Sequence, residues 1–394
     1  MTTCRHVLRA DRSFSPSDRA GPHGCLLYTG MYQEIKQLRG LTGHPFGVNL
    51  FMPQPEYADA AAVDVYAHQL AGEAGWYETE LGDPDSGRDD GYDAKLAVLL
   101  DNPVPVVSFH FGVPGREVLD SLRGAGTFTL VTATTAEEAL AVERAGADAV
   151  IVQGVEAGGH QGTHRDNPET DGTGIGLLSL LAQVRETVGI PIVAAGGIMR
   201  GGQIAAVLAA GASAAQLGTA FLATPESGAQ AVHKQALTNP LFVRTQLTRA
   251  FSGRPARGLV NRFMREHGPY APAAYPEVHH LTSPLRKAAA KAGDAQGMAL
   301  WAGQVYKRQG QRRRSVGKAV RCDDGPGVRR RAARRGARWA VRPRRPRGTA
   351  RGLREAAALR RGGRPHRRRR TLGGVRGAGR RGQGPAGCTG GLGR

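Results

Sequence analysis

Short apolar runs alternate with amphipathic segments along the chain from Met31 to Ser227. Several of the apolar runs are almost continuous in Val, Ile and Ala, which is typical of parallel strands buried on both faces. The intervening segments have the period expected of helices that pack one face against a sheet. We therefore predict strands over residues 45–51, 104–109, 127–132, 147–153, 190–195 and 214–217, and helices that include residues 135–145, 177–188 and 200–210.

Residues at the ends of these segments support the assignment. Thr135 and Glu138 have the spacing of a capping box, in which each side chain bonds a free backbone N–H at the start of a helix. Gly146 and Gly211 follow predicted helices, where glycine adopts the left-handed conformation that ends many helices. Strands that alternate with helices imply a parallel sheet, either open or closed into a barrel.

Polar residues gather where the predicted strands end, at Asn49, His110, Thr132 and Gln153. A (β/α)8 barrel carries its chemistry at this rim and typically binds phosphate with the loops after its last two strands. A Rossmann fold instead has its glycine-rich turn after the first strand, whereas here such turns follow the last two strands. We predict the α/β class and a (β/α)8 TIM barrel that lacks its first one or two strands, with residues 25–28 at most a poor second strand.

Composition divides the chain into four segments. The formal net charge is +21, but residues 305–394 hold 30 Lys and Arg against 3 Asp and Glu, whereas residues 1–304 hold 24 against 30. We predict an atypical N-terminal segment without clear strands or helices, the barrel, a cap with a predominantly helical pattern, and an Arg- and Gly-rich tail. These segments are residues 1–30, 31–238, 239–304 and 305–394.

The tail has too little apolar surface to offset the entropy of ordering, so we expect it to be disordered. One interpretation is a nucleic-acid-binding arm, because Arg clusters neutralise phosphates; aromatic residues for base stacking are scarce. The leading interpretation is GC-rich DNA read out of frame, because Arg, Gly, Ala and Pro have GC-rich codons and Lys is almost absent. The sequence Gly377–Gly382 matches G-x-G-x-x-G only by composition, since no strand precedes it.

Two further features concern location. No apolar run reaches the roughly 18 residues that span a bilayer, and Arg5 and Arg9 interrupt the N-terminal region where a signal peptide would need an apolar stretch. Residues 26–304 contain no Cys. A reducing, cytoplasmic setting is the natural expectation.

Three glycine-containing stretches could carry chemistry. Ala194–Ile198 and Gln216–Thr219 follow predicted strands, and glycine lets backbone N–H groups approach a phosphate closely. Each could also be an ordinary tight turn, but two in successive units favour a phosphate site. The third, Val152–His160, ends in a histidine whose near-neutral pKa suits acid–base catalysis, although a solvated loop histidine is the common alternative.

Metal binding at this loop is disfavoured. Glu156, His160 and His164 are four residues apart, a spacing that aligns ligands only on a helix, and the glycines between them oppose a helix. His110 could line the pocket or fill its rim. We interpret His44 and His279–His280 as surface or packing residues, and Asp83–Asp93 as a solvated loop that lacks the order of an EF-hand.

Several stretches resemble the nitronate monooxygenase family, formerly called 2-nitropropane dioxygenases. They are GVNLF at Gly47–Phe51, VQGVEAGGH ending at His160, AAGGI, QLGTAFL, Thr248–Phe263 and His279–Gln304. The resemblance covers about residues 31–304 and implies an FMN-dependent (β/α)8 barrel. By position, Asn49 and Gln153 would bond the flavin ring, Gly158 would lie against it, and His160 matches the catalytic base. The ribityl phosphate would be held by Gly196, Gly197, Gln216, Leu217, Gly218 and Thr219.

The resemblance implies oxidation of nitronates or nitroalkanes by O2 to a carbonyl compound and nitrite. His160 would take the α-proton of a nitroalkane or position a nitronate, with no metal and no membrane partner. The missing first strands would expose sheet edges, so we expect weakened FMN binding and poor solubility. The alternatives are an FMN-dependent enoyl-reductase of fatty-acid synthesis, nucleic-acid binding through the tail alone, and an inactive product of a damaged reading frame.

Overall fold

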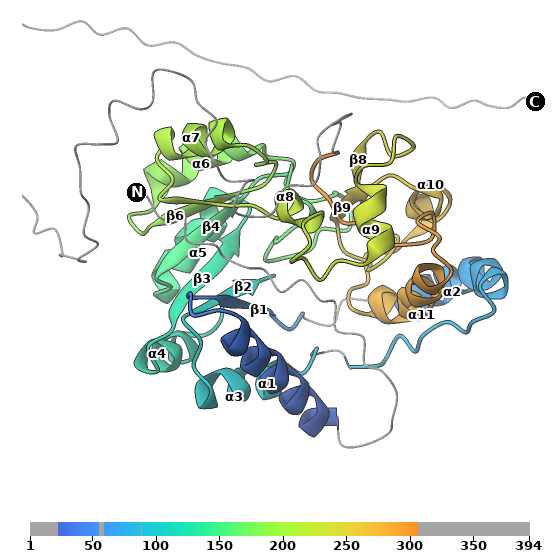
Figure 1. The fold of residues 1–394 in the computed structure, drawn as a ribbon, viewed down its shortest axis with the longest axis horizontal. Coiled ribbons are helices and arrows are strands. Elements are labelled where there is room, and N and C mark those ends of the chain that lie inside the picture. The colour runs from blue at the N-terminus through green and yellow to red at the C-terminus, as the bar shows by residue number, and fades with distance from the viewer. Residues whose placement is uncertain (1–22, 55–58, 88, 306–394) are drawn as a thin grey trace, which may run out of the picture. The chain divides into compact units, whose positions relative to one another are not determined.

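A six-stranded parallel sheet forms the centre of the molecule in the computed structural model, which describes residues 23–54, 59–87 and 89–305 (Figure 1). The strands run in the order β1-β2-β3-β4-β6-β7 and curl as part of a (β/α)8 barrel. Each of the six predicted strands is confirmed to within two residues at either end. Their bounds are β1 Gly47–Phe51, β2 Val106–His110, β3 Phe128–Ala133, β4 Ala149–Gln153, β6 Ile192–Ala195 and β7 Ala214–Gln216.

Helices cover the outer face of this sheet (Figure 1). Val107, Val131 and Val150 point outward into the main hydrophobic core, which the helices complete. The alternate residues of each strand face the inside of the curl, as the two-residue period of a strand requires. The covering helices are α1 His23–Leu41, α3 Tyr92–Asp101, α4 Arg116–Gly124, α5 Ala136–Ala145, α6 Leu177–Thr187 and α7 Gly201–Ala209.

The predicted helix ends are largely confirmed. The Thr135 side chain accepts a hydrogen bond from the backbone N–H of Glu138, and Gly146 ends α5 at φ +93°. The Glu138 carboxylate departs from the capping box, because it binds the backbone N–H and hydroxyl of Thr134 instead.

Helix α1 corrects the prediction for the N-terminal segment. It begins at His23, so residues 25–28 are helical and are not a remnant of a second strand. Apolar residues at positions 27, 31, 35 and 38 do have helical spacing, but glycines at positions 24 and 30 weaken the helical signal. Residues 1–22 lie outside the described part of the chain.

The sheet ends at β1 on one side and at β7 on the other. Within the described ranges, no strand pairs with the outer edge of either. A parallel barrel closes with eight strands, so the six strands of the described residues form a barrel that is open between β1 and β7.

A second layer holds a three-stranded antiparallel sheet in the order β5-β9-β8. Its strands β8 and β9 lie in the segment predicted to be predominantly helical, which is therefore mixed. Helices α2 and α11, far apart in sequence, lie side by side at one end of this layer (Figure 1). The bounds are β5 Gly159–His160, β8 Thr245–Thr248, β9 Ala256–Leu259, α2 Ala60–Trp76, α8 Thr219–Leu222, α9 Ala231–Ala236, α10 Arg262–His267, the 3-10 helix Gly268–Tyr270 and α11 Glu277–Lys291.

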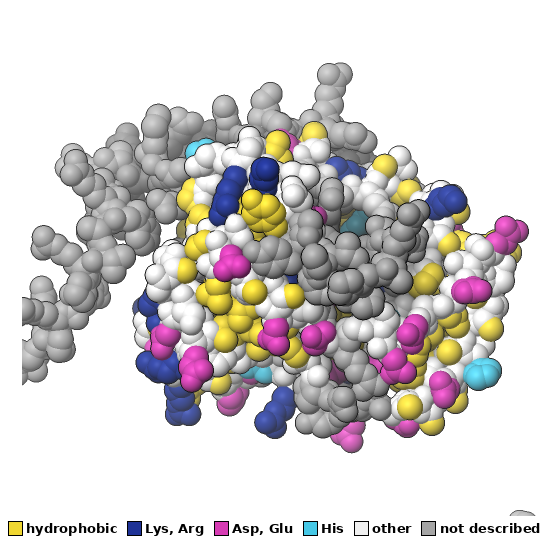
Figure 2. All heavy atoms as spheres, turned by 90° about the horizontal axis from the view of Figure 1, so that it is seen from below, with side chains coloured by type: hydrophobic (Ala, Val, Ile, Leu, Met, Phe, Trp, Pro, Cys, Tyr) yellow, Lys and Arg dark blue, Asp and Glu magenta, His cyan; other side chains and the backbone are white. Residues whose placement is uncertain are grey.

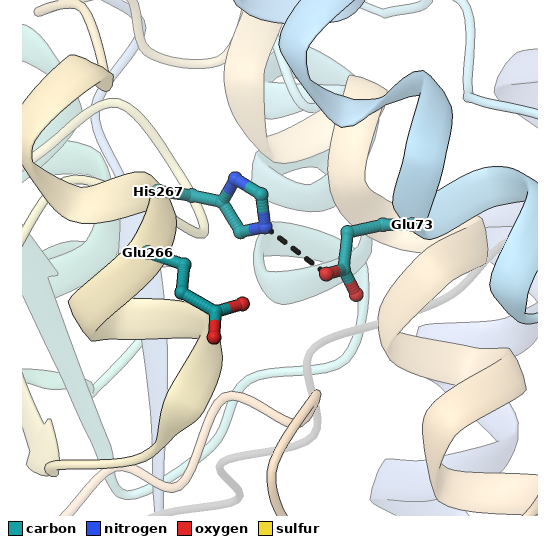
Figure 3. A group of neighbouring side chains, drawn as sticks. All are labelled: Glu73, Glu266 and His267. Atoms are coloured by element: carbon teal, nitrogen blue, oxygen red, sulfur yellow. Dashed lines mark hydrogen bonds and ion pairs between the residues drawn. The ribbon is translucent and has the colours of Figure 1, made fainter.

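An ion-pair cluster joins α2 to α10. The buried Glu73 carboxylate on α2 accepts two hydrogen bonds from the Arg262 guanidinium and one from His267 Nε2 at 3.1 Å. Arg262 also pairs with Glu266 at 2.6 Å. Figure 3 shows Glu73 facing Glu266 and His267 across the gap between the two helices.

The surface of the described part mixes charges. Acidic side chains are spread over the face drawn in Figure 2, with Lys and Arg interspersed, in keeping with the slight excess of acidic residues before residue 305. No helix among the described residues is long and apolar enough to cross a membrane. The predictions for the basic tail, including its G-x-G-x-x-G sequence, fall outside the described residues.

Candidate functional site

The strand register brings polar side chains together inside the curl. Asn49 lies opposite Ser108, whose hydroxyl donates to the Asn49 side-chain oxygen at 2.9 Å. Gln153 lies opposite Ala195, which in turn lies opposite Gln216. These residues share one face because each has the inward parity of its strand. The predicted gathering at the carboxyl ends of the strands is therefore present.

These side chains line an open pocket at the carboxyl ends of the strands. Eight of the nine residues predicted to bind a cofactor line it; Leu217 does not, because its side chain packs against the main core. His110 also lines the pocket. The predicted residues in the wall are Asn49, Gln153, Gly158, Gly196, Gly197, Gln216, Gly218 and Thr219.

Two glycine-containing turns form one end of the pocket. Gly196 and Gly197, directly after β6, adopt φ values of +117° and +66°, which side chains other than glycine rarely tolerate. Gln216, at the end of β7, has a buried side-chain oxygen with no hydrogen-bond partner among the described residues. This end of the pocket therefore presents an acceptor that a bound molecule with a donor group would satisfy.

Thr219 is oriented by the chain segment that closes this end of the pocket. Its hydroxyl oxygen accepts a hydrogen bond from the backbone N–H of Gly303 at 3.0 Å. A hydroxyl that already accepts from the backbone has its own proton left to donate to a bound anion. Gly303 packs so tightly that a Cβ there would lie 2.4 Å from the Glu156 carbonyl oxygen.

Gln153 fastens the loop that carries His160. Its side-chain nitrogen donates to the His160 carbonyl at 3.1 Å, and its side-chain oxygen accepts from the Gly162 backbone N–H at 2.7 Å. His110 contacts the same His160 carbonyl at 3.3 Å and the Thr132 hydroxyl at 3.0 Å. Both pocket side chains thus fix the backbone of the candidate base.

His160 itself lies on β5, which pairs with β9. It is not one of the residues that line the pocket of Asn49 and Gln216. Its Nε2 lies 2.8 Å from the hydroxyl of Ser252, and that hydroxyl donates to the Arg254 carbonyl at 3.3 Å. A hydroxyl that donates to a carbonyl accepts from the ring, so this network places the proton of neutral His160 on Nε2.

Aromatic rings surround His160. The ring centroids of Phe111, Trp301 and Tyr275 lie 5.6, 5.6 and 5.8 Å from that of His160, and Phe51 lies at 6.3 Å. Phe111 has φ +72°, a left-handed conformation that costs energy in a residue with a bulky side chain. Such strain persists where the surrounding structure holds the residue in place, often at a functional site.

A buried arginine supports the Phe111 ring. The Arg254 guanidinium lies 4.1 Å from the ring centroid and donates to Gln54 and Thr163. Burial lowers the pKa of Arg254 to about 10, so the guanidinium still carries its charge at neutral pH. The enclosure around His160 is consequently apolar on its surface and electropositive behind it.

The metal interpretation finds no convergent ligand set at the loop. The Glu156 carboxylate binds the Leu177 backbone N–H at the start of α6, and His164 contacts the Thr132 carbonyl at 2.8 Å. Elsewhere in the described part, Glu73, Glu266 and His267 have the spacing of metal ligands. Arg262 already supplies the positive charge between those two carboxylates.

Sequence reasoning assigned no role to four residues of the site, Ser252, Tyr275, Trp301 and Gln304, which lie in the segment predicted to be a helical cap. Ser252, Trp301 and Gln304 do fall within the two C-terminal stretches that resemble the family, whereas Tyr275 lies between them. His279, predicted to be a surface or packing residue, lies with its ring 6.2 Å from Tyr275. Only the folding of residues 239–304 over the sheet brings these side chains to His160 and the pocket.

A family model and two curated relatives point to one family. A family model described as nitronate monooxygenase matches residues 20–320. The chain is 43% identical over 305 residues to the nitronate monooxygenase of Pseudomonas aeruginosa, covering 72% of this chain and 84% of that protein. It is 38% identical over 275 residues to a probable nitronate monooxygenase of Staphylococcus haemolyticus, covering 69% and 77%.

Two solved structures are similar as well. A nitroalkane oxidase from Streptomyces ansochromogenes is 84% identical, with a TM-score of 0.69, and the match covers 70% of this chain and 79% of that one. FabK from Thermotoga maritima is 28% identical, with a TM-score of 0.52, covering 71% and 74%.

Proposed function

This chain belongs to the nitronate monooxygenase family, and on that premise we propose that it is an FMN-dependent enzyme that oxidises nitronates or nitroalkanes with O2. The products would be a carbonyl compound and nitrite. The observation that carries this proposal is the placement of His160, which is held by Ser252 and by Gln153 beside a pocket with an unsatisfied acceptor.

The pocket fits a flavin mononucleotide in its chemistry. The buried oxygen of Gln216 lacks a donor among the described residues, and the ribityl chain of FMN carries hydroxyl groups. Gly196, Gly197 and Thr219 offer backbone approach and a hydroxyl donor for the phosphate at the same end. Asn49 lines the wall beside the flavin ring in this assignment.

The bound FMN would supply the electron acceptor, which O2 reoxidises. The residues of the chain bind the substrate and move its proton. Held by Ser252 and Gln153, the imidazole of His160 is the group that would accept the α-proton of a nitroalkane. The hydrogen bond from Nε2 to Ser252 and the backbone bonds through Gln153 keep the ring in position for that transfer.

The aromatic enclosure fits the rest of this substrate class. Phe51, Phe111 and Trp301 offer apolar contact for an alkyl group and limit the access of water to the reacting carbon. The charge of Arg254 behind Phe111 favours an anion, such as a nitronate, over a cation.

The test distinguishes loss of the catalytic base from loss of flavin binding. A His160→Ala variant should keep the flavin absorbance of the wild type but lose turnover of neutral nitroethane, and it should lose less with ethyl nitronate, which needs no deprotonation. His44→Ala is the matched control, because His44 is exposed and precedes the start of β1, at the opposite edge of the sheet from the carboxyl ends of the strands. Equal turnover of nitroethane by wild type and His160→Ala would remove His160 from this role.

The alternative enoyl-reductase activity predicts a different result with the same preparation. Bleaching of the flavin by NADH or NADPH, without turnover of any nitronate in O2, would contradict the proposed function. Rapid nitronate oxidation without a nicotinamide would support it.

A further inference from the structure

Tyr275 lies beside His160 but has no place in the chemistry described so far. Its ring centroid is 5.8 Å from that of His160 and 5.3 Å from that of Phe111. The backbone before it packs against the turn that holds Ser252, since a Cβ at Gly253 would lie 2.1 Å from the Ala274 carbonyl oxygen. Tyr275 and the partner of His160 are thus fixed relative to one another.

The hydroxyl of Tyr275 is left for a ligand. It makes no hydrogen bond to any residue within the described ranges, and it is not one of the fully enclosed polar atoms that lack a partner. The side chain as a whole is half-buried. Burial, and to a lesser extent Asp90, raise the pKa of Tyr275 above its usual value of 10, so the hydroxyl keeps its proton and can donate.

The charges near this hydroxyl favour an anion. Arg254 and Arg286 both act on Tyr275 with their positive charges. Burial, and then Arg286, lower the pKa of His279 well below its usual value, so His279 is neutral at pH 7. Asp90, the carboxylate that acts on Tyr275, is paired with Lys95 at 2.6 Å.

The two arginines direct donors to the protein itself. The terminal nitrogens of Arg254 donate to Gln54 and to Thr163, while its buried Nε has no partner among the described residues. Arg286 donates to the Thr282 hydroxyl at 3.1 Å and to the His279 carbonyl at 2.8 Å. They supply positive potential, whereas Tyr275 supplies a hydroxyl donor with no acceptor among the described residues.

We propose that the Tyr275 hydroxyl donates a hydrogen bond to an oxygen of the substrate's nitro or nitronate group, while His160 acts at the α-carbon. This inference rests on the proposed function, because it assumes a nitro substrate beside His160. Tyr275 is then a substrate-binding residue that recognises a planar anion with two oxygens.

The proposal predicts different kinetic effects for a neutral nitroalkane and for a preformed nitronate. Negative charge accumulates on the nitro oxygens only as a neutral nitroalkane loses its α-proton, so there the hydrogen bond would raise kcat. A preformed nitronate carries the charge on arrival, so there the same bond would lower KM. A residue with a purely structural role would not divide its effect in this way.

The experiment is Tyr275→Phe in the full-length, FMN-loaded protein, since phenylalanine keeps the ring contacts and removes only the hydroxyl. We expect kcat/KM to fall about 10- to 100-fold for both substrate forms, the usual effect of losing a hydrogen bond to a charged group. The loss should appear in kcat for nitroethane and in KM for ethyl nitronate. Tyr270→Phe, on the preceding turn and 62% exposed, is the matched control and should match wild type.

A second measurement does not depend on turnover. Butanoate has the same planar pair of anionic oxygens as a nitronate, so its dissociation constant, measured from the flavin spectrum, should rise by a similar factor in Tyr275→Phe. Unchanged kcat/KM and butanoate binding, with wild-type flavin content, would overturn the inference. Wild-type protein that binds butanoate through Tyr275 but oxidises no nitronate would refute the proposed function alone.

Discussion

The Arg262 guanidinium binds two carboxylates that differ in burial, and this allows a sharp test of what holds α2 against α10. The Glu73 side chain is 8% exposed and lies on α2, whereas Glu266 is 52% exposed and lies four residues from Arg262 on α10 itself. Replacing either one by Gln removes a single negative charge and keeps the shape of the side chain. We expect Glu73→Gln to destabilise the protein far more than Glu266→Gln.

The magnitude follows from the burial of each partner. Removing one member of a fully buried pair costs about 3–5 kcal/mol, because the other charge is left uncompensated. Arg262 is 30% exposed and would keep Glu266 as a partner, so we expect about 2–3 kcal/mol for Glu73→Gln. The exposed pair within one helix is worth only about 0.3–0.5 kcal/mol.

Thermal unfolding followed by circular dichroism measures both changes. A loss of about 2–3 kcal/mol in a folded unit of this size lowers Tm by roughly 4–8 °C, and Glu266→Gln should lower it by about 1 °C. If the two variants have equal Tm values, the buried pair does not join the helices as we infer.

The pH dependence of the stability provides an independent test of the Glu73–Arg262 pair. Hydrogen bonds from Arg262, and to a lesser extent from His267, lower the pKa of Glu73 below its ordinary value of 4.5 despite burial. The stabilisation is then complete above pH 4.5 and is lost as the pH falls through the folded-state pKa. The difference in Tm between wild type and Glu73→Gln should therefore shrink below pH 4.5, and a difference that grows there would contradict the assignment.

Two further predictions concern the site. Ser252→Ala removes the hydrogen-bond partner of His160 Nε2. It should lower kcat/KM for nitroethane about tenfold at unchanged flavin content, because the lost hydrogen bond is worth roughly 1.5 kcal/mol. Steady-state kinetics that match wild type would count against the assigned tautomer. Gly303→Ala would place a Cβ within 2.4 Å of the Glu156 carbonyl oxygen, so the turn at Thr219 after β7 should shift. Overpacking of this kind costs about 1–3 kcal/mol, and we expect the FMN dissociation constant to rise about tenfold or more. Fluorescence titration with FMN measures this, and Gly72→Ala, where a Cβ meets nothing within 4 Å, should bind FMN as wild type does.

Much of the sheet could be predicted from the sequence because its signals are local. A strand buried on both faces must be apolar throughout, and the helices between strands repeat with their own period, so the boundaries of β1 to β4, β6 and β7 could be read from single segments. Glycine at position 146 likewise reports a backbone conformation that few other residues adopt. Helix α1 was missed although Met31, Ile35 and Leu38 have helical spacing, because the glycines at positions 24 and 30 weaken the signal in its first half.

The pocket was also largely predictable. Asn49, Gln153 and Gln216 each stand at the end of an apolar run, and parallel strands bring such ends to one edge of a sheet. Gly196 and Gly197 mark a turn with positive φ values that residues other than glycine rarely adopt.

The sequence by itself therefore determined the class of the fold, the edge of the sheet that carries the chemistry, and His160 as the candidate base. Only the tertiary structure decided what surrounds that base. Ser252, Tyr275 and Trp301 reach His160 because β9 pairs with β5 and α11 packs on α2, contacts between segments about 90 to more than 200 residues apart. Such contacts depend on how hydrophobic surfaces and backbone hydrogen bonds are satisfied across the whole chain, and no short stretch of sequence records them.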